Sequence, residues 1–144
     1  MGYTIHWEMK AGMALAAEEV DAALLHLSVD YDPRVLRLEV YQPGRMVSLA
    51  PAREVQVEAL TINAARKGNV AGSCKTNRTE PEDGEIKRLL VRLNRLLGNK
   101  LHVHCDDGYE YTGKGISIPN GHAIQVTLAE ATMLNLSNPG GDAV

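Results

Sequence analysis

The chain contains no phenylalanine and only one tryptophan among its 144 residues. Aliphatic side chains must therefore fill most of the core, and a hydrophobic content of 44% is sufficient for one globular domain of this length. No apolar run approaches the roughly 18 residues that a membrane-spanning helix needs, and the first segment has no signal-peptide pattern. We therefore expect a cytoplasmic protein with no membrane partner.

Cysteine is also scarce, and positive charge is slightly outnumbered by negative charge. Cys74 and Cys105 are too few for an all-thiolate zinc site within one chain, and in the cytoplasm we expect both to be free thiols. The formal net charge of −3 argues against a general nucleic-acid binder but allows a local basic patch. The sequence has no Walker loop, no nucleophile elbow and no His-Glu-x-x-His helix. No complete catalytic motif is therefore visible, and no stretch matches the motif residues of a known family.

The strongest pattern that is present predicts a helix near the middle of the chain. Its apolar residues recur at three- and four-residue steps, which places them on one face. Pro81 suits the first helical position and Gly98 suits the end, while Gly84 delays the regular part. The apolar face consists of Ile86, Leu89, Leu90, Leu93, Leu96 and Leu97.

Alternating polar and apolar residues predict strands at 3–10, 35–41 and 100–105, with shorter ones at 46–49 and 70–76. Residues 11–27 favour a helix because they are rich in Ala, Leu and Glu. Residues 51–67 fit either a helix, which we slightly favour, or a strand, because 55–62 partly alternates. We predict a single α+β domain over 1–136, with an antiparallel or mixed sheet of about four or five strands covered on one face by two or three helices, and a flexible tail at 137–144.

The predicted strand at 100–105 carries the first candidate site. His102 and His104 lie two residues apart, so they project from the same face, opposite to Leu101, Val103 and Cys105. With Asp106 they form a candidate site for a divalent metal, the one cofactor that the sequence suggests. The alternative is a solvent-exposed strand that happens to carry histidine.

Thiol chemistry is the second candidate. Lys75 adjoins Cys74 and Arg78 is close in sequence, and positive charge lowers the pKa of a thiol. A small metal- or thiol-dependent enzyme would then use Cys74, His104 and Asp106, with His102 nearby, provided that the strands bring them together. The alternative is that both cysteines are small buried apolar residues.

A basic surface is the third candidate. Arg88, Arg92 and Arg95 lie opposite the leucine face of the central helix, and Lys87 lies on its flank. Such a surface suits an acidic protein or a nucleic acid, although a solvated helix face is the commoner reading.

Our leading expectation is a non-enzymatic interaction or inhibitor module with a protein partner, because no complete catalytic constellation is visible while the domain is small and well patterned. A small acidic chain without a familiar signature is often met among phage and bacterial accessory proteins. The metal- or thiol-dependent enzyme and nucleic-acid binding are the alternatives. Edge strands also leave a homo-oligomer open.

Overall fold

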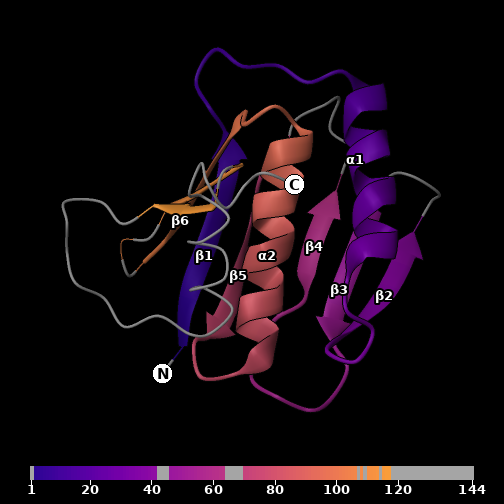
Figure 1. The fold of residues 1–144 in the computed structure, drawn as a ribbon, viewed down its shortest axis with the longest axis vertical. Coiled ribbons are helices and arrows are strands. Elements are labelled where there is room, and N and C mark those ends of the chain that lie inside the picture. Colours follow the sequence, from indigo (N-terminus) through magenta and orange to yellow (C-terminus); the bar gives the residue numbers. More distant parts are fainter. Residues whose placement is uncertain are drawn as a thin grey trace, which may run out of the picture.

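A computed structural model describes residues 2–41, 46–63, 70–106, 108, 110–113 and 115–117 (Figure 1). The predicted tail at 137–144 and the end of the predicted domain at 118–136 lie outside these residues. Neither helix of the described chain is long and apolar enough to cross a membrane.

The described strands form two antiparallel sheets. The larger sheet has the strand order β5-β1-β6-β7-β8 and the smaller one the order β2-β3-β4. In the order of the larger sheet, the strands are β5 (Gly72–Asn77), β1 (Gly2–Met9), β6 (Leu101–Cys105), β7 (Glu110–Thr112) and β8 (Gly115–Ser117). The smaller sheet contains β2 (Leu36–Tyr41), β3 (Met46–Pro51) and β4 (Leu60–Asn63).

The two sheets lie side by side, because β4 is next to β5 (Figure 1). Helices α1 (Ala17–Asp30) and α2 (Pro81–Leu96) cover the same side of this layer of strands (Figure 1). The prediction of a single α+β domain with helices on one face is confirmed, and the division of the strands between two sheets is a feature that the sequence did not predict.

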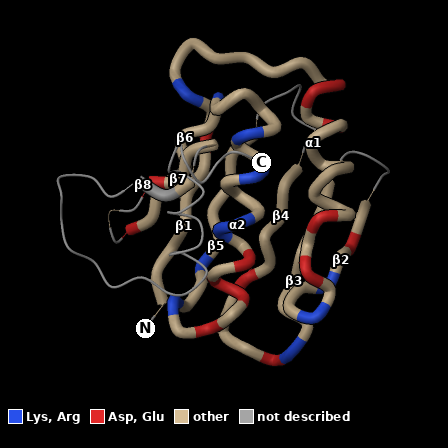
Figure 2. The backbone as a smooth tube through the Cα atoms, viewed as in Figure 1, with Lys and Arg blue, Asp and Glu red and all other residues tan. Residues whose placement is uncertain are grey.

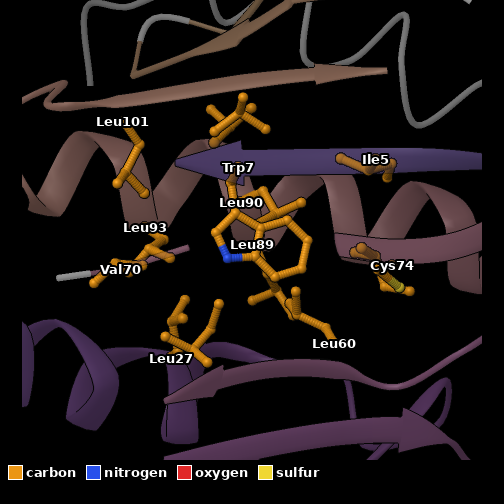
Figure 3. Packing of buried hydrophobic residues seen from close by; sticks show 14 of the residues in the cluster. Ile5, Trp7, Leu27, Leu60, Val70, Cys74, Leu89, Leu90, Leu93 and Leu101 are labelled. Atoms are coloured by element: carbon orange, nitrogen blue, oxygen red, sulfur yellow. The ribbon is translucent and has the colours of Figure 1, made fainter. Parts of the chain in front are cut away.

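The apolar residues of β1 and α2 build the centre of the core. Trp7 on β1 is almost completely buried and lies against Leu89 and Leu90 of α2, with Leu27 of α1 and Leu60 of β4 on its other side (Figure 3). Gly72 faces Trp7 across the β1–β5 pair, and the indole occupies the space that a Cβ atom at Gly72 would need. The single tryptophan thus joins both helices to both sheets.

The central helix forms as predicted, although it begins at Pro81 and Gly84 does not delay it. It ends where Gly98 and Asn99 both take left-handed backbone angles, with φ of 68° and 61°. The buried side chain of Asn94 accepts a hydrogen bond from the Leu101 N–H and donates to the carbonyls of Leu101 and Tyr111. This amide fixes the last turn of α2 to β6 and β7.

The helix slightly favoured over 51–67 is wrong for the described part of that range. Pro51 is the last residue of β3, residues 52–59 contain no helix, and β4 follows. Leu60 and Ile62 are buried while Thr61 and Asn63 are exposed, so the two-residue alternation decides the structure here.

Candidate functional site

Three histidines and three carboxylates occupy the face of the larger sheet that lies opposite the helices. The pairing of β1 with β6 places Glu8 opposite His102 and His6 opposite His104. The pairing of β6 with β7 places His104 opposite Glu110. Because side chains alternate along a strand, these residues share one face. The cluster, called the histidine face below, consists of His6, Glu8, His102, His104, Asp106 and Glu110.

The three imidazole rings of the histidine face form a row. The His104 ring lies between the other two, with its centroid 4.6 Å from that of His102 and 5.2 Å from that of His6. The rings are inclined to one another by 28° and 26°. Strand pairing thus brings the three rings together, although His6 and His104 are 98 positions apart in the sequence.

Carboxylates lie at both ends of this row of rings. The Oε1 atom of Glu8 lies 3.9 Å from Nδ1 of His102, and Oε1 of Glu110 lies 3.8 Å from its Nε2. At the other end, Asp106 Oδ1 lies 3.0 Å from His6 Nε2, and its second oxygen accepts the Thr4 backbone N–H at 3.3 Å. Asp106 therefore orients the His6 ring, whereas the two carboxylates beside His102 lie near its nitrogens without a hydrogen bond. Carboxylates take similar positions where histidine binds a metal.

Three residues of the histidine face have the spacing of a metal site. Each offers one ligand atom, and the ligand atoms of Glu8, His102 and His104 all lie within 4.8 Å of one another. A tetrahedral ion with bonds of about 2.1 Å places its ligand atoms about 3.4 Å apart. Small side-chain rotations close this difference, and solvent leaves room for them because the side chains of Glu8 and His102 are 65% and 46% exposed.

A shallow depression of about 440 Å³ runs along the same face. His6, Glu8, His104 and Asp106 line it on one side, and Ser73 lines it from β5. The depression gives a small ligand or a water molecule a route to the imidazoles.

The sequence anticipated part of this arrangement. His102 and His104 lie on one side of β6 and Cys105 on the other, as predicted. Asp106, the third predicted ligand, pairs instead with His6, and Glu8 takes the position beside His102. The alternation of β1 already placed His6 and Glu8 on its solvent side, but nothing in the sequence showed that β1 pairs with β6.

The predicted site that combined Cys74 with the histidines is wrong. Cys74 lies opposite Ile5, whose other neighbour is Cys105, so all three face the core while the histidines face away from it. The Cys74 thiol donates to the Glu58 carbonyl at 3.2 Å. Burial, together with the negative charge of Glu58, raises the pKa of Cys74 to about 12, so the thiol stays protonated at neutral pH. Lys75 does not activate it, because that side chain is exposed on the opposite face.

The basic surface predicted on α2 is smaller than the sequence indicated. Lys87 is fully buried and forms an ion pair of 2.8 Å with the equally buried Asp83, so its assignment to that surface is wrong. Its ammonium group also lies 4.8 Å from the centre of the Tyr3 ring. Tyr3 in turn donates its hydroxyl to Asp83, and burial beside this carboxylate raises the pKa of Tyr3.

The arginines of α2 do reach the surface, but their charge is partly neutralised. Arg88 forms ion pairs with Glu85 at 2.7 Å and with Asp30 of α1 at 3.3 Å, and Arg92 lies 3.7 Å from the same Asp30 carboxylate. Arg95 donates to the carbonyl of Gly113 at 2.7 Å. Figure 2 shows acidic positions beside the basic ones around the first turns of α2.

No protein-family model, no curated protein and no solved structure matches this chain.

Proposed function

We propose that this protein binds a divalent transition-metal ion through Glu8, His102 and His104. The observation that supports the proposal is the convergence of their three ligand atoms within 4.8 Å on an exposed face. Imidazole nitrogen and carboxylate oxygen together suit ions such as Zn²⁺, Ni²⁺ and Cu²⁺ and suit Ca²⁺ or Mg²⁺ poorly.

The neighbours of these ligands have the roles that supporting groups take at metal sites. If Nδ1 of His102 binds the ion beside Glu8, its Nε2–H points toward Glu110, whose oxygen lies 3.8 Å away. A carboxylate in this position fixes the tautomer and raises the basicity of the ligand nitrogen. The ring of His104 is held between its two stacked neighbours.

Three protein ligands leave a tetrahedral ion with one open position, which is the arrangement of catalytic rather than structural zinc sites. Water in that position becomes more acidic, and the adjoining depression gives a substrate access to it. An enzyme built on this chain would therefore be metal-dependent rather than thiol-dependent, with hydrolysis as its reaction class.

The test is calorimetric titration of untagged, metal-free protein with Zn²⁺. We expect one ion per chain, and we expect Glu8→Gln, His102→Ala and His104→Ala each to weaken binding at least about tenfold. His26→Ala is the matched control, because His26 is an exposed histidine on α1 that lies outside the cluster. No saturable Zn²⁺ binding, or equal weakening by His26→Ala, overturns the proposal.

His6→Ala distinguishes between two ligand sets. We expect this variant to bind Zn²⁺ nearly as well as the unmodified protein, because His6 is paired with Asp106. A loss as large as that of His102→Ala would move the site to the other end of the row of rings.

An interaction module with a protein partner, and nucleic-acid binding, remain the other candidates from the sequence. The residues of α2 support them less than expected, because Lys87 is buried and both Arg88 and Arg92 are paired within the chain. Strong electrostatic binding to a polyanion needs cations that are free to release counterions.

A further inference from the structure

Strand β2 lies at the edge of the smaller sheet, where β3 is its only partner among the described strands. The Ala52 N–H donates to the Val35 carbonyl, which makes this facing pair a hydrogen-bonded one. Hydrogen-bonded pairs alternate along an antiparallel ladder, so residues 37, 39 and 41 are bonded to β3. The backbone N–H and C=O groups of Leu38 and Val40 and the C=O group of Leu36 therefore point away from β3, toward the open edge. The Leu36 N–H donates to the Asp32 carbonyl at 3.0 Å within the chain.

This edge lacks several of the features that usually prevent strands from pairing between molecules. Residues 36–41 contain no proline and no lysine, and their register with β3 is continuous, without a bulge. Exposed apolar side chains lie on the edge strand itself, because Val40 is 49% and Tyr41 44% exposed.

The charges of β2 are complementary to β2 itself. Arg37 and Glu39 are separated by one residue, so they lie on the same face of the strand, and Leu38 between them points to the other face. When two such strands run antiparallel with Leu38 opposite Leu38, each Arg37 faces a Glu39 of the other copy. In the same register Leu36 faces Val40. The central Leu38 pair then exchanges two bonds, and the Val40 N–H of each copy donates to the Leu36 carbonyl of the other. The Leu36 N–H keeps its bond to Asp32.

We propose that the protein forms a two-fold symmetric homodimer by antiparallel pairing of β2 with β2 of a second copy, centred on Leu38. The two sheets then join into one continuous sheet across the dimer, with α1 of both copies on the same side. Leu38 and the exposed Val40 bring apolar contacts to the helix side of the seam, beside the buried Leu36, and Arg37 and Glu39 bring ion pairs to the other side. A second copy is the favoured occupant because a single register satisfies backbone, apolar and charged groups together.

This interface is independent of metal binding, because the proposed ligands lie on β1 and β6 of the other sheet. The dimer therefore brings a second metal site without adding a residue to the first, and either proposal can fail alone.

Charge exchange at β2 tests the register directly. The unmodified protein is expected to sediment as a dimer at high concentration in analytical ultracentrifugation. Arg37→Glu places two Glu–Glu pairs across the seam and Glu39→Arg places two Arg–Arg pairs there, so each single variant is expected to dimerise at least about tenfold more weakly. The double variant R37E/E39R restores both attractive pairs and is expected to recover dimerisation.

Mixing the two single variants provides the sharpest result. The R37E chain is acidic at both positions and the E39R chain is basic at both, so the mixture is expected to form a heterodimer more readily than either variant dimerises alone. Glu54→Arg is the control, since it makes the same charge change as E39R at an exposed position in the chain after β3. Both residues exchanged on β2 are well exposed, so the fold should survive the substitutions.

Three results overturn the proposal. The first is an unmodified protein that stays monomeric up to near-millimolar concentration. The second is a dimer that neither single charge reversal weakens. The third is a mixture of R37E and E39R that shows no heterodimer beyond the self-association of each.

Discussion

The buried ion pair between Asp83 and Lys87 offers the most direct check on the core. Both side chains are completely inaccessible to solvent, their charged atoms are 2.8 Å apart, and Tyr3 donates its hydroxyl to the same carboxylate. Lys87→Met keeps the length and much of the volume of the side chain but removes its charge. Asp83 is then left buried with the Tyr3 hydroxyl as a hydrogen-bond donor but without the Lys87 ammonium that faces it.

The size of the effect follows from the burial. Removing one partner of a buried ion pair typically costs about 3–5 kcal/mol, because the remaining charge has lost its compensation. A domain of this size has a total stability of about 5–15 kcal/mol, so the variant should remain folded with markedly lower stability. At about 2–4 °C per kcal/mol, its melting temperature should fall by roughly 10 °C.

Urea unfolding followed by Trp7 fluorescence measures this loss, and a double-mutant cycle separates the ion pair from simple packing. Asp83→Asn alone is expected to destabilise the fold by a similar amount, whereas Asp83→Asn combined with Lys87→Met should cost clearly less than the sum, because no unpaired charge remains. Lys75→Met, an exposed lysine on β5, is the control and should change stability by no more than about 0.5 kcal/mol.

Two results would refute this reasoning. One is a Lys87→Met variant that loses no more stability than the Lys75→Met control. The other is a double variant whose loss equals the sum of the two single losses, which would mean that the charges do not interact.

Two further predictions concern the sheet beside β1. Gly72→Ala would place a Cβ atom 2.6 Å from Cζ2 of Trp7, so we expect urea unfolding to show a loss of stability of about 1–3 kcal/mol. Gly2→Ala is the control and should be tolerated, because the nearest neighbour of its Cβ atom is a lysine side-chain carbon at 3.3 Å. Equal stability of the two variants would contradict the packing. The second prediction follows from the raised pKa of Cys74. Above pH 9 the thiol of the unfolded chain loses its proton, while the buried thiol keeps its proton until about pH 12. The free energy of unfolding should therefore fall as pH rises through this window, by up to about 1.4 kcal/mol per pH unit. Cys74→Ala should show a shallower decline over the same range, and an unchanged slope would show that the thiol ionises equally in both states.

The sequence predicted local structure well where one periodicity dominated. The strands around Ile5 and Val103 and the helix around Leu93 were all correctly predicted, because each buries one face and exposes the other. It misplaced Lys87 because α2 is buried on more than one side. Its flanks contact α1 and β7, and Tyr111 of β7 lies near the Lys87 ammonium. Hydrophobic periodicity reports the leucine face and gives no sign that a second, polar face is also covered.

The candidate site was only half visible for a related reason. His102 and His104 are neighbours in the sequence, so their shared face followed from the alternation of a strand. Glu8 and His6 join them only through the pairing of β1 with β6, which connects residues almost a hundred positions apart. Cys74 was placed with the histidines because it flanks the same helix, but strand register puts it on the opposite side of the sheet.

The position of β1 between β5 and β6 has a consequence for synthesis on the ribosome. The first strand to emerge has no partner until Cys74 and its neighbours follow, which at about 5–20 residues per second takes roughly 3–14 s. During that time the apolar side of β1, including Ile5 and Trp7, is exposed in the nascent chain. The hairpins of β2, β3 and β4 need only neighbouring residues and are free to form meanwhile. Completion of the fold therefore waits for the second half of the chain, and the N-terminal strand is the segment that a chaperone would be expected to hold.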